Sequence, residues 1–298
     1  MTTYHNLTVA DGVNVFYREA GSTSKPTLLL LHGFPASSFQ YRNLIPLLSD
    51  SYHIIAPDMP SFGFTTTPSN YTYTFSALTS TISAFLLALN LTTFSLYIFD
   101  YGAPVGLRLA LQPDFTITAL ITQNGNAYLD GFGHPFWDPI MAYWRSHSAA
   151  DRSFIRDNVL TLDGFASQYT TGVPASHLDR LDPAAWTLDY AQSVARPGTA
   201  DAQLDLLYDY QTNVELYPRF QAWLRERQPP LLVAWGKNDP AFVPPGAEAF
   251  RRDVPGAEVT FLDTGHFAVE TDWVELAGLM RRFLGRVVGG KKDGEAGA

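Results

Sequence analysis

The sequence predicts an α/β protein with a mostly parallel central sheet, helices on both faces of the sheet, and a helical insertion after the sixth strand. Three observations predict this fold class. A hairpin pattern opens the chain, short apolar runs then alternate with amphipathic stretches, and the alternation stops between residues 126 and 220. Uninterrupted apolar runs are typical of parallel strands that are covered on both faces. Alternation of strand and helix predicts right-handed crossovers between such strands.

The hairpin is the first element. In "YHNLTVADGVNVFYREAG" apolar residues alternate on both sides of Asp11-Gly12, a dipeptide that favours a tight turn between antiparallel strands. The apolar runs that follow are "TLLLLHG", "YHIIAPD", "SLYIFD", "TALITQNG", "PLLVAWG" and "EVTFLDTG". Helices are predicted over residues 37–48, 74–89, 105–111, 246–252 and 267–287. Ligands of such sheets bind beyond the carboxyl ends of the strands, so we expect the functional site there.

The insertion is rich in Tyr, Trp, Phe and His and shows no clear buried strand. The segments "HPFWDP", "TGVPAS", "LDPAAW" and "ARPGT" interrupt it, which indicates several helices, because compact domains rarely contain a structureless loop of this length. We therefore predict a core in two parts, residues 1–125 and 221–288, with the helical insertion over 126–220. Residues 289–298 are Gly-rich and charged, and they are expected to form a flexible tail.

Composition limits the classes of partner. The 298 residues include 20 Lys and Arg against 29 Asp and Glu, a net charge of −9, so binding to nucleic acid or to a membrane surface is not indicated. The absence of cysteine excludes disulfides, thiolate metal sites and a Cys nucleophile. No signal peptide or membrane span is recognisable, so a cytoplasmic location is expected. No metal-binding or phosphate-binding motif is present, so we expect no metal and no organic cofactor. The expected partners are a small apolar substrate and water, and a homodimer is left open.

The stretch "SLYIFDYGAPVG" places Asp100 at the tip of an apolar strand, directly before a Gly-containing turn and a predicted helix. The nucleophile at such a strand–turn–helix elbow is usually the Ser of G-x-S-x-G. Here Asp100 takes its place, Gly102 allows the sharp turn, and Ile98 stands where the first Gly is usual. The alternative is that Asp100 only caps the helix, because Asp is a favoured N-cap residue.

Other segments favour a catalytic interpretation of Asp100. Asp239 follows a late apolar strand in "LLVAWGKNDPAFVPP", and His266 follows the next strand in "FLDTGHFAVE". The chain order of nucleophile, acid and histidine is the one expected for this architecture. In "LLLLHGFPASS", the loop after an earlier strand can direct the backbone N–H of Phe34 to the same point as the N–H of Tyr101, which predicts an oxyanion hole.

These segments, with "HGFPASSFQYRNLIP", "APDMPSFGFT", "GKNDP" and "DTGHF", resemble the α/β-hydrolase fold superfamily. The closest resemblance is to its branch with an Asp nucleophile, the epoxide hydrolases and haloalkane dehalogenases. The resemblance implies that residues 126–220 form a cap over the active site. It also implies that Asp100 forms a covalent alkyl ester, which is hydrolysed by water that His266 activates while Asp239 orients the imidazole. An Asp that attacks an ester would give an anhydride, whereas attack on sp³ carbon gives an ordinary ester, so the residue type favours epoxides or haloalkanes.

The two chemistries need different hydrogen-bond donors. Epoxide opening releases a basic alkoxide, which needs a proton donor such as a Tyr hydroxyl, whereas a halide needs only N–H donors. Haloalkane dehalogenases usually carry Trp after the nucleophile and often Asn in the His-Gly-x-Pro loop; here Tyr101 and Phe34 stand there, although Trp137 could substitute. Epoxide hydrolases usually set two cap tyrosines on the epoxide oxygen. Tyr210 matches the second of these, and Ile140 occupies the position of the first.

The resemblance therefore predicts an epoxide hydrolase with Tyr210 as its proton donor. A haloalkane dehalogenase is the alternative, and a non-hydrolytic rearrangement enzyme or a ligand sensor on the same fold is the third. Aromatic side chains are expected to line the substrate pocket, namely Trp137, Tyr143, Tyr128, Tyr217 and Phe267.

Overall fold

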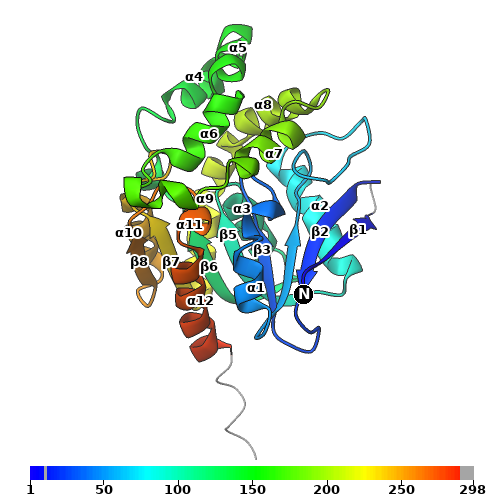
Figure 1. Ribbon diagram of the computed structural model, residues 1–298, viewed down its shortest axis with the longest axis vertical. Coiled ribbons are helices and arrows are strands. Elements are labelled where there is room, and N and C mark those ends of the chain that lie inside the picture. The colour runs from blue at the N-terminus through cyan, green and yellow to red at the C-terminus, as the bar shows by residue number, and fades with distance from the viewer. Residues whose placement is uncertain (10–11, 289–298) are drawn as a thin grey trace, which may run out of the picture.

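The computed structural model describes residues 1–9 and 12–288. Its eight-stranded sheet has the strand order β1-β2-β4-β3-β5-β6-β7-β8 (Figure 1). β2 pairs antiparallel with β1 and with β4, and the remaining neighbours are parallel, which confirms the predicted fold class. The hairpin is present, although Asp11 of its predicted turn lies outside the described residues. The strands are β1 (Thr3–Thr8), β2 (Asn14–Ala20), β3 (Thr27–Leu31), β4 (His53–Pro57), β5 (Thr93–Phe99), β6 (Thr116–Gln123), β7 (Leu231–Gly236) and β8 (Glu258–Leu262).

The strands are apolar throughout because each face of the sheet has its own layer of helices. In β3, Leu29 and Leu31 join one core cluster with side chains of α2 and α3, whereas Leu28 and Leu30 join a second with α1 and α12. Successive side chains of a strand point to opposite faces, so both faces are buried. The core helices are α1 (Leu44–Leu48), α2 (Phe75–Ala88), α3 (Gly102–Ala110), α10 (Pro244–Asp253), α11 (Ala268–Thr271) and α12 (Trp273–Val287).

Some core helices differ from the sequence prediction. The segment 37–48 is divided into a 3₁₀ helix, η1 (Ser38–Tyr41), and α1. The segment 267–287 is divided at Asp272, whose φ of −126° and ψ of 32° lie outside the helical region. Helix α3 begins at Gly102, earlier than predicted, because the chain turns into it directly after Asp100.

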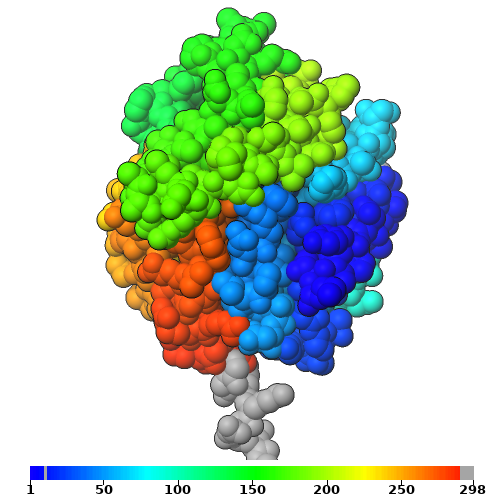
Figure 2. Space-filling view, viewed as in Figure 1, coloured from blue at the N-terminus to red at the C-terminus, as the bar shows by residue number. Residues whose placement is uncertain are grey.

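The insertion between β6 and β7 forms a layer of helices beyond the carboxyl ends of the strands (Figure 1), and it caps the upper end of the molecule in Figure 2. Helix α9 contacts α3 and α10 of the core as well as α8 of the insertion. The predicted boundary at residue 220 therefore falls inside a helix that packs against both the core and the insertion. The predicted tail, residues 289–298, lies outside the described residues. The helices of the insertion are η2 (Leu129–Gly131), α4 (Asp138–Ser146), α5 (Ala149–Asn158), α6 (Leu162–Thr170), η3 (Ala175–Arg180), α7 (Pro183–Ser193), α8 (Thr199–Asp209) and α9 (Gln211–Arg227).

The helices were compared with the length and apolarity of a membrane-spanning helix. Within residues 1–9 and 12–288, no helix combines the length and the apolar character needed to cross a lipid bilayer.

Candidate active site

The elbow after β5 holds Asp100 in a left-handed backbone conformation, with a φ of 45°. Asp tolerates this region better than most residues other than Gly. The surrounding chain is close: a Cβ atom at Gly33 would lie 2.3 Å from the Cβ of Asp100, and a Cβ at Gly102 would lie 2.3 Å from the carbonyl oxygen of Leu31. Glycine is therefore needed at both positions for the elbow to approach the loop after β3.

Ile98 occupies the position where this kind of elbow usually has its first Gly. Its side chain points toward α3, where Gly106 leaves room for it: a Cβ at Gly106 would lie 2.5 Å from the Cγ2 of Ile98. The larger side chain on the strand is thus matched by a missing side chain on the helix.

The Asp100 side chain does not cap α3, whose N-cap residue is Tyr101. Instead, its Oδ1 accepts a hydrogen bond from the backbone N–H of Phe34 at 2.6 Å, and the backbone N–H of Tyr101 also hydrogen-bonds this carboxyl. Its Oδ2 lies 3.9 Å from the Nε2 of His266. Burial raises the pKa of Asp100 to about 6, although His266 and the two N–H groups oppose the rise. The carboxyl is therefore a buried acid that ionises near neutral pH.

His266 lies between two carboxyl groups. Its Nδ1 is 2.6 Å from the Oδ2 of Asp239, and its Nε2 faces Asp100. Burial opposes the charged imidazolium, but Asp239 and Asp100 outweigh that effect, so the pKa of His266 is raised. The structure thus brings together Asp100, Asp239 and His266, each from the carboxyl end of a different strand.

Asn124 is a residue at this site that the sequence reasoning missed. It lies at the end of β6, and its Nδ2 donates a hydrogen bond to the Oδ2 of Asp239 at 2.7 Å. The backbone N–H of Ala241 donates to the other oxygen, Oδ1, at 2.7 Å. Asn124 has a φ of 48°, and its place in "TQNG" directly after an apolar run was the available signal. These donors fix the carboxylate of Asp239 in the orientation that meets His266.

Tyr210 lies where α8 meets α9, with its ring against those of Tyr101 and Trp137 at 5.7 and 5.0 Å between centroids. Its hydroxyl is 3.4 Å from the hydroxyl of Tyr217, which in turn is 3.4 Å from the Nδ2 of Asn126. Burial raises the pKa of Tyr210 well above its ordinary value, so the phenol stays protonated. It can therefore act as a donor.

A small cavity lies in front of Asp100, with about 20 Å³ open to the centre of a water molecule. This volume suits at most a single water, so a substrate needs the cap to shift or the aromatic side chains to turn. The lining is mainly apolar and comes from both core and cap. It consists of Phe34, Asp100, Tyr101, Phe136, Trp137, Ile140, Val159, Gln168, Leu207, Ala241 and His266.

The other four expected pocket residues lie outside this lining, and two of them have hydroxyls that are engaged elsewhere. The hydroxyl of Tyr143 accepts a hydrogen bond from Arg152 at 3.0 Å. The hydroxyl of Tyr128 donates to Asp253 at 2.7 Å. The other two contact residues of the site: the hydroxyl of Tyr217 is 3.4 Å from that of Tyr210, and the ring of Phe267 contacts the His266 ring at 5.1 Å between centroids. Of the expected pocket residues, Trp137 is the one in the lining, and the expected proton donor Tyr210 lies outside it.

Trp137 does not offer its indole N–H to the cavity. The Nε1 of Trp137 donates a hydrogen bond to the carbonyl oxygen of Ala241 at 2.8 Å. The Nε1 of the nearby Trp144 likewise donates a hydrogen bond to the carbonyl oxygen of Leu207 at 2.7 Å. In this conformation the indole N–H of Trp137 therefore cannot serve as the N–H donor that a halide would need.

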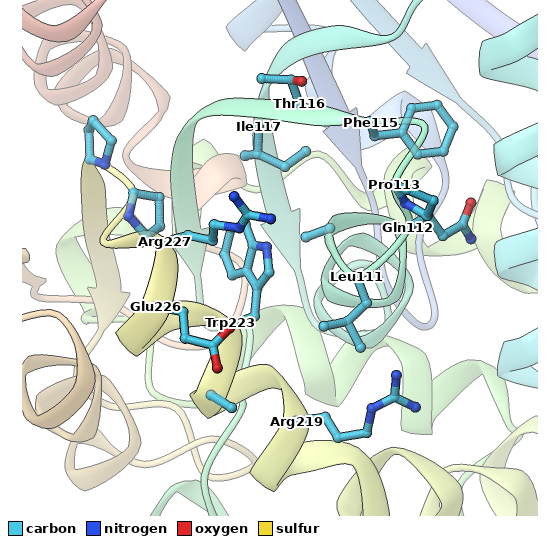
Figure 3. Close-up of a pocket in the computed structure, with 14 residues that line it drawn as sticks. Leu111, Gln112, Pro113, Phe115, Thr116, Ile117, Arg219, Trp223, Glu226 and Arg227 are labelled. Atoms are coloured by element: carbon cyan, nitrogen blue, oxygen red, sulfur yellow. The ribbon is translucent and has the colours of Figure 1, made fainter.

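Figure 3 shows a larger hollow, of about 700 Å³. It is formed by the C-terminal end of α3, the start of β6 and the second half of α9, with Trp223 and Arg227 projecting into it. It contains none of Asp100, Asp239 and His266, so size alone does not identify the site. Within the described part of the chain, no group of three or more His, Asp or Glu side chains could hold a metal ion.

A family model described as the alpha/beta hydrolase fold matches residues 26–272. The chain belongs to the α/β-hydrolase family. A Saccharomyces cerevisiae protein named as an uncharacterized hydrolase is 51% identical over 277 residues, covering 92% of this chain and 94% of that protein. A cis-3-alkyl-4-alkyloxetan-2-one decarboxylase from Xanthomonas campestris is 28% identical over 301 residues, covering 94% of this chain and 95% of the relative.

Solved structures share the fold of this α/β hydrolase. A haloalkane dehalogenase from Bradyrhizobium elkani superposes with a TM-score of 0.76 at 21% identity, covering 97% of this chain and 98% of that one. An epoxide hydrolase named CorEH gives a TM-score of 0.75 at 17% identity, covering 96% and 99%. The predicted membership of the α/β-hydrolase superfamily is confirmed.

Proposed function

We propose that this α/β hydrolase is an epoxide hydrolase that forms a covalent alkyl ester on Asp100 and converts a small apolar epoxide to a diol. The observation that carries the proposal is the placement of the Asp100 carboxylate. Its Oδ1 is held by the N–H of Phe34, and its Oδ2 is directed toward His266 at 3.9 Å. One oxygen is thereby fixed and the other is left to react.

In the first step, Oδ2 of Asp100 attacks a ring carbon, the C–O bond of the epoxide breaks, and the released alkoxide takes a proton from the hydroxyl of Tyr210. A carboxylate bound to an sp³ carbon gives an alkyl ester, which a second step can cleave. Tyr210 is the candidate donor because its ring contacts Tyr101 and Trp137, which line the cavity, and because its hydroxyl is protonated. Tyr210 itself lies behind this lining, so its hydroxyl reaches a substrate only when the side chains or the cap shift.

In the second step, His266 takes a proton from water, and the hydroxide attacks the carbonyl carbon of the ester. The N–H groups of Phe34 and Tyr101, both of which hydrogen-bond the Asp100 carboxyl in the resting protein, then hold the oxyanion. Asp239 orients the imidazole and stabilises its cation. The tetrahedral intermediate collapses with cleavage of the bond between the carbonyl carbon and the alkyl oxygen, and His266 gives its proton to that oxygen, which becomes the second hydroxyl of the diol. The proton that Asp100 gives up when the carboxylate is regenerated restores Tyr210.

The donors around the cavity favour an epoxide over a haloalkane. The indole N–H of Trp137 already donates to the carbonyl oxygen of Ala241, and the side chains of Phe34 and Tyr101 carry no N–H group. Two tyrosines are close to the cavity, Tyr101 in its lining and Tyr210 against the Tyr101 ring. An alkoxide needs a proton, whereas a halide does not. Haloalkane hydrolysis is therefore the less supported alternative.

A second candidate is the decarboxylation of a four-membered lactone. It is favoured by the relationship, along 94% of this chain, to an enzyme named as a cis-3-alkyl-4-alkyloxetan-2-one decarboxylase. Attack of Asp100 on the sp³ ring carbon would break the C–O bond and release a carboxylate, which needs no proton donor. Loss of CO₂ with expulsion of Asp100 would then leave an alkene and the free carboxylate.

The proposal is tested with the variant His266→Gln and a panel of terminal epoxides, bromoalkanes and cis-dialkyl oxetan-2-ones. We expect His266→Gln to accumulate an adduct with the mass of the epoxide on the peptide that contains Asp100, because the ester forms but water is not activated. Peptide mass spectrometry measures the adduct. The control His134→Gln changes an exposed residue of the cap and should turn over epoxides like the wild type.

Each other outcome of the panel assigns a different chemistry. An adduct with bromoalkanes alone would indicate a haloalkane dehalogenase. Alkene and CO₂ from an oxetan-2-one, without turnover of epoxides, would indicate the decarboxylase reaction. Failure of every epoxide to form an adduct would refute the proposal.

The rate of ester formation is expected to fall as the pH decreases through about 6, because the pKa of Asp100 is raised to about 6 and only the carboxylate is a nucleophile. Hydrolysis of the ester should weaken in the same direction, since the pKa of His266 is raised and only its neutral form accepts a proton. Rapid-quench measurement of ester formation in the wild type separates the two steps. A first-step rate that stays constant well below pH 6 would contradict the assignment of Asp100.

A further inference from the structure

Tyr101 is the residue directly after Asp100, and its backbone N–H already belongs to the site. Its side chain is 1% exposed and lines the cavity. The ring contacts Phe75, Phe34 and Tyr210, with centroids 4.9, 5.7 and 5.7 Å away. Tyr101 therefore stands in an aromatic wall that joins the core elbow to the cap.

The hydroxyl of Tyr101 is buried, yet it has no hydrogen-bond partner among the residues that the structure describes. A buried donor without a partner destabilises the fold, and a phenylalanine would fill nearly the same volume without that cost. Such groups call for an explanation, of which a functional role is one. The neighbouring Tyr210 differs, because its hydroxyl has Tyr217 at 3.4 Å.

The charges near the Tyr101 hydroxyl and the residues that line the cavity connect this hydroxyl with the proposed ring opening. Burial, followed by the negative charges of Asp100 and Asp209, raises the pKa of Tyr101 well above its ordinary value, so the phenol remains protonated beside the nucleophile. The cap offers no second donor where the resemblance would place one, because Ile140 lines the cavity there. Tyr101 thus lines the cavity with a hydroxyl that has no partner among the described residues, and the cap tyrosine Tyr210 lies behind the lining, with its ring against that of Tyr101.

We infer that the hydroxyl of Tyr101 donates a hydrogen bond to the substrate oxygen during ring opening, so that the donor pair consists of Tyr210 from the cap and Tyr101 from the core. Tyr210 transfers its proton to the oxygen, while Tyr101 stabilises the developing negative charge and keeps its own proton. This inference rests on the proposed epoxide chemistry. It makes Tyr101 a catalytic residue through its side chain in addition to its backbone N–H.

The experiment isolates the first step by adding Tyr101→Phe to the His266→Gln background and measuring the rate at which an epoxide adduct forms on Asp100. We expect about a 10²-fold slower rate, the size of effect found when one donor to a developing oxyanion is removed. Hydrolysis of the ester in an otherwise wild-type Tyr101→Phe protein should be unchanged, because that step uses backbone N–H groups. The melting temperature should be equal to or above that of the parent, since an unsatisfied hydroxyl is removed.

Tyr41→Phe is the matched control. Tyr41 is also fully buried, but its ring packs on Tyr97 in the core cluster of α1 and α12, away from the cavity. It should leave adduct formation unchanged. Adduct formation by Tyr101→Phe at the parental rate would overturn the inference while leaving the proposed function intact. Slower formation together with a lower melting temperature would also overturn it, because the hydroxyl would then serve the fold. The absence of any epoxide adduct in His266→Gln itself would instead refute the proposed function.

Discussion

Replacement of Asp100 by Asn is expected to abolish turnover and, at neutral pH, to stabilise the folded protein. The loss of the nucleophile should lower kcat by about 10⁶-fold, the size of effect found when a covalent nucleophile is removed. Asn is the appropriate substitute because it tolerates the φ of 45° at this elbow and can still accept the Phe34 N–H through its amide oxygen. No adduct should form on the variant, because an amide is a poor nucleophile.

The stability effect follows from the raised pKa of Asp100. Between pH 3.8 and about 6 the folded protein binds more protons at Asp100 than the unfolded chain does, so stability falls as the pH rises through this window. The rise of the pKa from 3.8 to about 6 corresponds to about 3 kcal/mol of lost stability above that window. Asp100→Asn removes this cost, so urea unfolding at neutral pH should show a more stable variant.

Asp189→Asn is the control for the Asp100 variant. Asp189 is also a buried carboxyl with a raised pKa, caused mainly by burial, but it lies where α7 meets the core and is hydrogen-bonded by Tyr169 and Ser37. Its variant should retain turnover. An Asp100→Asn protein that still turned over epoxides would show that the nucleophile lies elsewhere. If the Asp100→Asn protein were less stable than the wild type at neutral pH, the Asp100 carboxyl would stabilise the fold, contrary to this prediction.

Asp239→Asn is expected to arrest the reaction at a different stage, with the alkyl ester formed and its hydrolysis lowered by about 10³–10⁴-fold. Asp239 raises the pKa of His266 and holds its Nδ1 at 2.6 Å, so without the carboxylate the imidazole is a weaker and poorly oriented base. The attack of Asp100 on the epoxide carbon requires neither the basicity nor the orientation of the His266 imidazole. Rapid mixing should therefore show a burst of one adduct per protein followed by slow turnover.

Asp263 provides the control for Asp239. It lies three positions before His266 in the printed sequence, and it is exposed and paired with Lys237 at 3.1 Å. Asp263→Asn should leave both steps unchanged, because a surface ion pair contributes little. An impaired Asp263→Asn beside an active Asp239→Asn would mean that the acid of the site had been assigned to the wrong residue.

Much of the fold could be predicted from the sequence because it depends on local patterns. The uninterrupted apolar run of β3 indicated two buried faces, and the two core clusters divide its side chains accordingly. The helical insertion followed from the loss of this pattern after β6. The boundary at residue 220 could not be predicted, because α9 continues through it, and a helix that packs on both the cap and the core shows no change in sequence there.

The sequence by itself determined the order of strands and helices and the positions of Asp100, Asp239 and His266 at strand ends, because period, turn chemistry and chain order are local properties. Only the tertiary structure decided which hydroxyls and N–H groups are available at the cavity. Asn124 reaches Asp239 from another strand end, the indole N–H of Trp137 donates to Ala241, and the hydroxyl of Tyr101 has no partner among the residues that the structure describes. Each of these depends on contacts between segments far apart in the chain, and no spacing of residues encodes such contacts.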